Sequence, residues 1–161
     1  KVTKAQFIQL VSSEQERLRR FLLALCCGNR ADAEDLAQEA LMHAYLSLGA
    51  YHEREKFAAW LHRIAYNAFL DSRRRSRRTE PMDAATTIAA PGQTDDGYRY
   101  QELHAALNVL PEKERTAVLL FYLQGYAVKE IAEIMGGSIP AVKKQLERGR
   151  DKLKISLPRA V

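Results

Sequence analysis

The sequence predicts an all-α fold of two small helical modules joined by a flexible linker. Several stretches place apolar residues at the i, i+3, i+4 spacing of amphipathic helices. The charge falls into three parts: residues 1–78 carry 14 Lys and Arg against 9 Asp and Glu, residues 79–110 carry 1 against 5, and residues 111–161 carry 10 against 6. Two basic blocks around an acidic, irregular stretch indicate two binding modules and a linker.

The composition is that of a folded protein with an anionic partner. A chain of 161 residues makes one domain or two small ones, and a hydrophobic content of 47% is enough for a packed core. The net charge of +5 favours an anionic partner without naming it. Because no run of 18 apolar residues and no signal-peptide pattern is present, we expect a soluble, cytoplasmic protein without membrane insertion.

Two helices, over residues 4–27 and 32–48, are expected to open the first module. The first should stop at residues 28–29, and Asp32 stands where the N-cap of the second belongs. The residues of the second helix expected to face the core are Leu36, Ala37, Ala40, Leu41, Ala44, Tyr45 and Leu48. The residues expected on or near its other side are Asp35, Gln38, Glu39 and Met42, of which the first three form a polar strip. This strip is either a set of helix-start acids that favour solubility or a docking site for a basic partner surface.

The third helix, residues 57–78, combines a packing face with a basic end. Its apolar stripe is formed by Phe57, Trp60, Leu61, Ile64, Ala65 and Ala68. The remaining positions include Arg63, Asn67 and Asp71, followed by the run of Arg73, Arg74, Arg75, Arg77 and Arg78. A nucleic-acid strand could be stacked upon and charge-neutralised by such a segment. The alternative is an ordinary core helix followed by a solvated basic loop.

Residues 79–97 lose all periodicity and are expected to be a linker, since Pro, Gly, Thr and Asp dominate them. A helix is predicted over residues 98–110. Pro111 then occupies the first turn of a further helix that runs to about residue 123. The core face of that helix is expected to consist of Val118, Leu119, Tyr122 and Leu123.

The last fifty residues predict a helix-turn-helix. A short helix over residues 128–135 contains the small Ala132, and Gly136-Gly137 makes the turn. Ser138 is a good N-cap for the last helix, and Pro140 is tolerated in its first turn. The residues expected inward are Val142, Leu146, Gly149 and Leu153. Those expected outward, facing a DNA major groove, are Lys143, Lys144, Glu147, Arg148 and Arg150. A plain helical hairpin is the alternative.

The residues that carry out catalysis or bind metals in other proteins form no recognisable group here. Cys26 and Cys27 are adjacent, so they are poorly placed to pair with each other, and no Cys or His spacing fits zinc. We expect two buried free thiols, no metal and no cofactor. A small nucleic-acid enzyme would need clustered carboxylates or a nucleophile pair, and none is visible.

Taken together, these parts resemble an extracytoplasmic-function (ECF) sigma factor over almost the whole chain. The segments that carry the resemblance are ADAEDLAQEALMHAY, FAAWLHRIAYNAFLDSRRR and LPEKERTAVLLFYLQGYAVKEIAEIMGGSIPAVKKQLERGRDKL. They are similar to a region-2 helix, the promoter-melting helix and region 4. The resemblance implies region 2 over residues 1–78, a linker over 79–97 and region 4 over 98–161. Such a protein is not an enzyme; it gives RNA polymerase its promoter specificity.

The resemblance also implies residue roles. Asp35, Gln38 and Glu39 match the docking surface for the clamp helices of the polymerase β′ subunit, and region 4 is implied to meet the β flap. The segment implied to capture the melted minus-ten strand includes Arg63, Asn67, Asp71, Arg73, Arg74, Arg75 and Arg77. The residues implied to read the minus-thirty-five duplex are Ser138, Ala141, Lys143, Lys144, Glu147 and Arg148. Trp60 matches a family tryptophan, but its place in the stripe indicates packing. An anti-sigma factor is a further implied partner.

Four positions depart from the common pattern of that family: Ala127, Gly137, Gln145 and the acidic Glu147 on the DNA face. The departures leave the predicted fold intact, but because of them the promoter sequence cannot be predicted from the family pattern. A second class of protein also fits the helix-turn-helix. It is a one-component transcription regulator whose N-terminal helices sense or dimerise, and it would bind duplex DNA tightly without polymerase.

Overall fold

The computed structural model describes residues 2–51, 56–79 and 95–157, and within these ranges the chain forms helices and no strand. The predicted linker at 79–97 lies mostly outside the described residues. Where the chain is described again it is already helical from Asp95, three residues before the predicted start. None of the helices in the described part has the length and hydrophobicity needed to cross a membrane.

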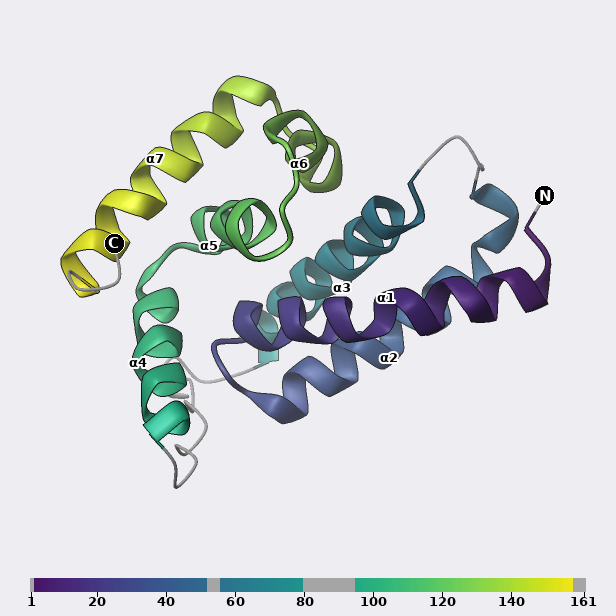
Figure 1. Cartoon of the computed structure of the whole chain (residues 1–161), viewed down its shortest axis with the longest axis horizontal. Coiled ribbons are helices and arrows are strands. Elements are labelled where there is room, and N and C mark those ends of the chain that lie inside the picture. Colours follow the sequence, from purple (N-terminus) through teal and green to yellow (C-terminus); the bar gives the residue numbers. More distant parts are fainter. Residues whose placement is uncertain (1, 52–55, 80–94, 158–161) are drawn as a thin grey trace.

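The first module consists of three helices and a short 3₁₀ turn (Figure 1). They are α1 (Lys4–Leu25), α2 (Arg30–Leu46), η1 (Leu48–Ala50) and α3 (Phe57–Thr79). The apolar stripe predicted for α3 is buried here, with Leu61 and Ala65 fully covered, and α1 buries Leu18 and Phe21 against it. Burial of these side chains at about 25 cal/mol per Å² is the main stabilising contribution to the module.

Two details of α2 differ from the prediction. The N-cap is Asn29, not Asp32: the Asn29 side chain accepts a hydrogen bond from the Asp32 backbone N–H at 3.1 Å, so the helix begins two residues earlier. Asn29 can do this because its backbone is extended. Tyr45, expected in the core, keeps 43% of its surface exposed, because the α2 core face is made mainly of the small Ala33, Ala37 and Ala40.

The second module contains five helical elements stacked beside the first (Figure 1). They are α4 (Asp95–Val109), α5 (Glu112–Val118), the π-helical turn η2 (Leu119–Leu123), α6 (Val128–Met135) and α7 (Ile139–Ser156). The predicted core face of the fifth helix is half correct. Val118 and Leu119 are buried, but Tyr122 and Leu123 are 55% and 46% exposed. The wider π turn rotates the residues after Leu119 out of the α-helical register.

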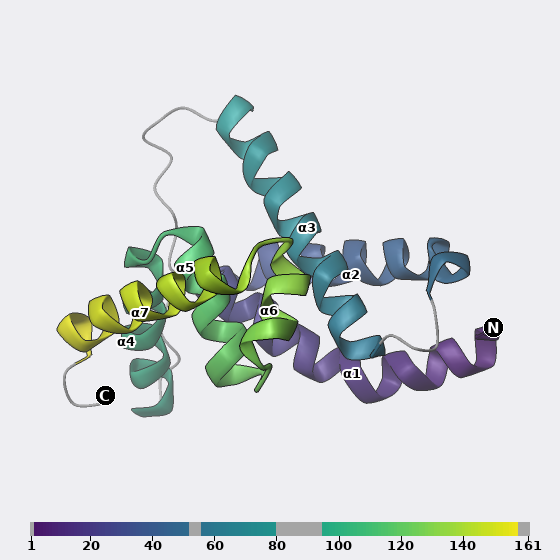
Figure 2. The same ribbon diagram turned by 90° about the horizontal axis from the view of Figure 1, so that it is seen from above.

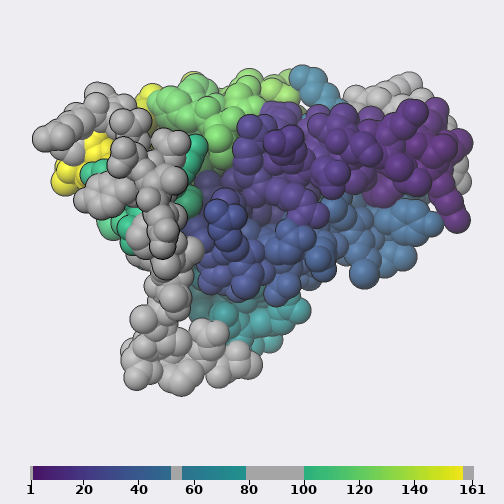
Figure 3. All heavy atoms as spheres, turned by 60° about the horizontal axis from the view of Figure 1, so that its bottom comes forward, coloured from purple at the N-terminus to yellow at the C-terminus, as the bar shows by residue number. Residues whose placement is uncertain are grey.

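The two modules pack directly against each other. α3 lies against α6, α1 contacts both η2 and α4, and the buried apolar side chains form a single cluster that continues through both modules. In the view of Figure 2 the C-terminal part of α3 projects beyond this packed region. In the space-filling view of Figure 3 the green surface of the second module abuts the purple surface of α1.

Candidate nucleic-acid interface

The polar strip on α2 is exposed as predicted. Asp35, Gln38 and Glu39 lie opposite the buried side of the helix. Gln38 donates a hydrogen bond to Glu34 at 3.3 Å. The Glu39 carboxylate lies 3.7 Å from the Arg75 guanidinium of α3, so the strip borders the arginine-rich part of the third helix.

An apolar extension of this strip was only partly predicted from the sequence, since Met42 was expected on this side of the helix and Leu46 was not. Met42 and Leu46 are 66% and 75% exposed, and they follow Gln38 at intervals of four residues, which places the three on one line of the helix. The four-residue spacing was visible in the sequence. Tyr45 stands beside them, with its ring 5.7 Å from that of Phe7. A surface with acids at one end and large apolar side chains at the other is typical of a protein-binding site.

The predicted minus-ten residues lie on α3 as a mixture of free and engaged side chains. Arg63, Asn67 and Asp71 are exposed at four-residue intervals and share one face. Arg74 is paired with Asp71. Arg73 is half-buried, with its guanidinium carbon 5.0 Å from the centre of the Phe69 ring. Arg77 donates to Glu112 of the second module at 3.0 Å.

Trp60 belongs to the core of the first module. Only 5% of its surface is exposed, and its ring packs against Phe57 and Tyr51, with ring centres 5.8 and 5.0 Å apart. The packing role expected from its place in the stripe agrees with this position. Base stacking by Trp60 would require the aromatic cluster to open.

The C-terminal helices form the turn expected of a helix-turn-helix. Gly136 adopts a left-handed backbone (φ 66°) that ends α6, a conformation that favours glycine. The Ser138 hydroxyl then accepts from the Ala141 N–H at 3.3 Å and caps α7, with Pro140 in the first turn. Gly149 is buried where α7 crosses α5, and a Cβ there would meet Val118 Cγ2 at 2.7 Å. Sequence patterns therefore place α7 correctly.

The outward face of α7 is basic and free. Lys143, Lys144, Glu147 and Arg148 are exposed, and within the described part of the chain no hydrogen bond or ion pair holds them. Ala141 is half-buried, and the Ser138 hydroxyl is already used as a cap. Such a face can offer cationic donors to guanine and phosphate and a carboxylate acceptor to cytosine N4.

The two cysteines lie in the interior of the first module. Cys26 and Cys27 are buried free thiols, and burial raises the pKa of Cys26 to about 12, which keeps it protonated and unreactive. Across ranges 2–51, 56–79 and 95–157, no group of three or more His, Cys, Asp or Glu side chains is placed to hold a metal ion.

A three-helix module with an arginine-rich exposed helix and a helix-turn-helix module with a basic exposed face are both typical of proteins that bind nucleic acid. The chain matches the family models described as Sigma-70 region 2, over residues 10–79, and Sigma-70, region 4, over residues 100–153. It therefore belongs to the sigma-70 family and, as the following relatives show, to its ECF RNA polymerase sigma factors. A one-component regulator is not favoured.

Curated relatives share about a third of their residues with this chain. It is 35% identical over 140 residues to the ECF RNA polymerase sigma factor EcfG of Rhodopseudomonas palustris, covering 84% of this chain and 76% of the relative. It is 32% identical over 145 residues to the ECF RNA polymerase sigma factor SigW of Bacillus subtilis, covering 81% and 78%.

Two solved complexes contain chains with a similar fold. The first holds the sigma factor RpoE with the anti-sigma factor NepR from Bartonella quintana. It matches with a TM-score of 0.82 and 28% identity, over 95% of this chain and 97% of the other. The second holds CnrH with the cytosolic domain of CnrY. It matches with a TM-score of 0.74 over 97% and 90%, and at 24% identity it supports the fold alone.

Proposed function

We propose that this chain directs core RNA polymerase to promoters in the cytoplasm, where it docks through α2, reads duplex DNA with α7 and holds a melted strand on α3. The observation that carries the proposal is that one chain exposes a basic face on α7, an arginine-rich face on α3 and, beside the latter, a polar, acidic strip on α2. The chain performs no covalent chemistry itself. Binding energy alone selects the promoter and stabilises its opened form.

Docking on polymerase is assigned to Asp35, Gln38 and Glu39, extended by the exposed Met42 and Leu46. The carboxylates would meet the basic side of the β′ clamp helices, and the apolar side chains would supply buried area at the centre of the contact. The second module would meet the β flap. Together these contacts fix the distance between the two DNA-reading surfaces.

DNA reading is divided between the modules. On α7, Lys143, Lys144 and Arg148 are placed for guanine edges or phosphates of the minus-thirty-five element and Glu147 for cytosine N4. On α3, Asn67 has the amide that can hydrogen-bond an extruded minus-ten base, and the arginines that follow would neutralise the strand.

The relatives in solved complexes point to a third partner. Both RpoE and CnrH are held by another protein, NepR and the cytosolic domain of CnrY, and NepR is an anti-sigma factor. We infer that an anti-sigma factor also binds this chain. Co-purification from the native host tests this inference: recovery of polymerase subunits alone would count against a dedicated inhibitor.

A pull-down with core polymerase tests the proposed function. We expect wild-type protein to be retained, and Asp35→Lys with Glu39→Lys to lose at least tenfold in affinity, because two attractive contacts become repulsive. The matched control is Glu16→Lys with Glu102→Lys, which makes the same charge change at exposed positions outside the strip. Retention of the strip variant at the wild-type level would move the docking site elsewhere.

In vitro transcription on genomic DNA with mapped start sites would then reveal the promoter sequence. If wild-type protein neither binds core polymerase nor produces specific starts, the proposed function is wrong. If it does both, aligned start sites will show which base pairs lie beneath Glu147 and Arg148.

A further inference from the structure

A partly buried ion pair lies next to one of the candidate DNA-reading residues of α7. Lys152 Nζ donates to the Glu114 carboxylate of α5 at 2.7 Å, and the Glu114 side chain keeps only 11% of its surface exposed. Lys152 follows Arg148 by four residues, so their side chains are neighbours on one line of the helix. The carboxylate that Lys152 holds is therefore within one helical turn of Arg148.

Glu114 and Arg148 also share a groove. Both residues line a groove of about 530 Å³ beside α5 and α7, together with Gln145, which precedes Arg148 by three residues. The Gln145 Oε1 atom is buried and, among the described residues, has no hydrogen-bond partner. A guanidinium that turned into this groove would find a carboxylate and an unpaired amide oxygen.

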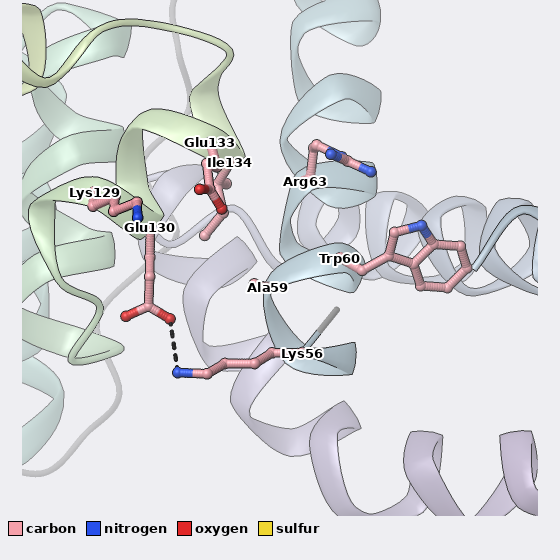
Figure 4. Close-up of a pocket in the computed structure, with 8 residues that line it drawn as sticks. All are labelled: Lys56, Ala59, Trp60, Arg63, Lys129, Glu130, Glu133 and Ile134. Carbon is pink, nitrogen blue, oxygen red and sulfur yellow. Dashed lines mark hydrogen bonds and ion pairs between the residues drawn. The ribbon is translucent and has the colours of Figure 1, made fainter. Parts of the chain in front are cut away.

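The Glu114 carboxylate depends on its lysine more than a second glutamate of the module does. Figure 4 shows that second glutamate, Glu130, whose pair with Lys56 is longer, at 3.2 Å, and leaves the Lys56 side chain 76% exposed, against 41% for Lys152. Glu130 also accepts the Ala127 backbone N–H at 3.1 Å. Within the described part of the chain, the partner of the Glu114 carboxylate is Lys152. Without Lys152 a nearly buried carboxylate would lack a counter-charge, which is costly.

Arg148 is the cation best placed to take over that carboxylate. It is one turn from Lys152 and is held by no hydrogen bond or ion pair within the described residues. A guanidinium pairs with a carboxylate through two parallel hydrogen bonds, and it uses the same fork of donors to read guanine O6 and N7. Arg148 cannot do both at once, so pairing with Glu114 would remove it from the DNA face.

We propose that Lys152 is a positioning residue for Arg148: by occupying the Glu114 carboxylate, it keeps the Arg148 guanidinium free to read the minus-thirty-five element. This role rests on the proposed function for the identity of the DNA. The arrangement of the three side chains belongs to the second module alone.

Promoter selection by the polymerase holoenzyme tests the effect on DNA reading. The template is a pool of promoters made from one mapped start site, with the minus-thirty-five element randomised, and Arg148→Ala identifies the base pair that Arg148 reads. Lys152→Met should lower the preference at that base pair about tenfold, the size of one lost bidentate base contact. The matched control is Lys154→Met, which removes an exposed lysine two residues later and should select as wild type does.

A rescue variant separates positioning from a general structural role. Lys152→Met with Glu114→Gln removes the competing carboxylate together with the lysine, so it should recover the wild-type preference. If the ion pair only stabilised the fold, the double variant would stay as impaired as Lys152→Met. The proposal is overturned by that result, by an unchanged preference in Lys152→Met, or by a uniform loss across all sequences, which would identify Lys152 as a phosphate contact.

Side-chain NMR of the free chain provides a measurement without polymerase or DNA, and the same spectra show whether each variant is folded. The Arg148 Nε–H should exchange with solvent severalfold more slowly in Lys152→Met than in wild type, and the double variant should exchange as wild type does. Unchanged exchange in Lys152→Met would refute the inference. A wild-type holoenzyme without any minus-thirty-five preference would instead refute the proposed function and leave the NMR result standing.

Discussion

The hydroxyl of Tyr126 lies 3.2 Å from Nδ1 of His62, and this contact joins the helix-turn-helix module to the N-terminal part of α3. His62 Nδ1 is also 2.8 Å from the Ala58 carbonyl. Because a carbonyl only accepts hydrogen bonds, Nδ1 carries the proton of the neutral ring, and Nε2 is left as a buried lone pair. The ring packs against Phe21 and Tyr126 in an interior with no room for a hydrated charge.

This environment predicts acid sensitivity. The pKa of His62 is lowered to about 4, mainly by burial and also by the nearby Arg17 cation, while the Ala58 carbonyl and the neighbouring Gln124 side chain oppose the shift. The unfolded chain has the higher pKa, so the stability is present above pH 6.5 and is lost as pH falls from 6.5 towards 4. Between pH 7.5 and 5.0 the loss should be about 2 kcal/mol.

Urea unfolding at the two pH values measures this loss. His62→Phe should reduce it to a few tenths of a kcal/mol, and His43→Phe, at an exposed position of α2, should leave it unchanged. The Tyr126 hydroxyl also faces the ring, but burial raises the pKa of Tyr126 to about 12, so it does not titrate in this range. Equal pH dependence in wild type and His62→Phe would assign the acid sensitivity to carboxylates instead.

Replacement of Arg115 should cause a large loss of stability. Its buried guanidinium donates to the carbonyls of Leu25, Leu107 and Leu110, at 2.8, 2.9 and 3.0 Å, near the C-terminal ends of α1 and α4. Arg115→Met removes the guanidinium donor from the buried Leu25 and Leu110 carbonyls, while the Leu107 carbonyl keeps its bond from the Leu110 N–H. The change also removes a cation from two helix C-termini, and together these losses should cost about 3 kcal/mol.

Thermal unfolding followed by circular dichroism checks this expectation. Arg20→Met, which removes an exposed guanidinium from α1, is the matched control and should change stability by less than about 0.5 kcal/mol. A small effect at Arg115 would mean that water replaces the guanidinium at these carbonyls.

Periodicity and capping chemistry were enough to predict most of the fold. The apolar stripe of α3, the Gly136 turn and the Ser138 cap all follow from residue types that act within one helix or one turn. The exposed faces of α2 and α7 followed as the complements of their buried stripes. Their assignment to polymerase and promoter came from the family resemblance and still awaits experiment.

The contact between the modules could not be predicted in this way. Arg115 and His62 look like surface residues in a polar pattern, and only the approach of helices distant in sequence buries them. Tyr122 and Leu123 were expected in the core but are exposed for a similar reason. The π turn breaks the α-helical spacing on which that prediction depended. Non-local packing and a register shift leave no local signal.

The lack of a side chain at Gly149 allows α7 to lie close to α5. Gly149→Ala would gain about 1 kcal/mol of helix propensity. It would also place a methyl group 2.7 Å from Val118 Cγ2 and 3.5 Å from the Glu114 carbonyl oxygen, in the helix crossing. We expect the clash to dominate, with a net loss of about 1–2 kcal/mol in thermal unfolding.

The control is Gly137→Ala, because a Cβ at Gly137 meets nothing within 4 Å. A neutral or stabilising effect of Gly149→Ala would show that α7 can move outward at little cost. The position of its DNA-facing residues relative to α5 would then be adjustable.

Replacement of Asn67 should impair promoter opening without affecting polymerase binding. Its amide is exposed on α3, between Arg63 and Asp71, and no described contact uses it. If the amide bonds an extruded minus-ten base, Asn67→Ala should lower open-complex formation roughly tenfold, since loss of one base contact costs about 1–3 kcal/mol. Affinity for core polymerase should not change, because the α2 strip is intact.

Permanganate footprinting of the melted strand and a core pull-down measure the two effects on the same preparation. Asn108→Ala, the same change in α4, should behave as wild type in both assays. If Asn67→Ala also opens promoters normally, strand capture lies with the arginines further along α3. The next variants would then be Arg74→Ala and Arg75→Ala, whose exposed guanidinium groups lie beside the Asp71 and Glu39 carboxylates in this structure.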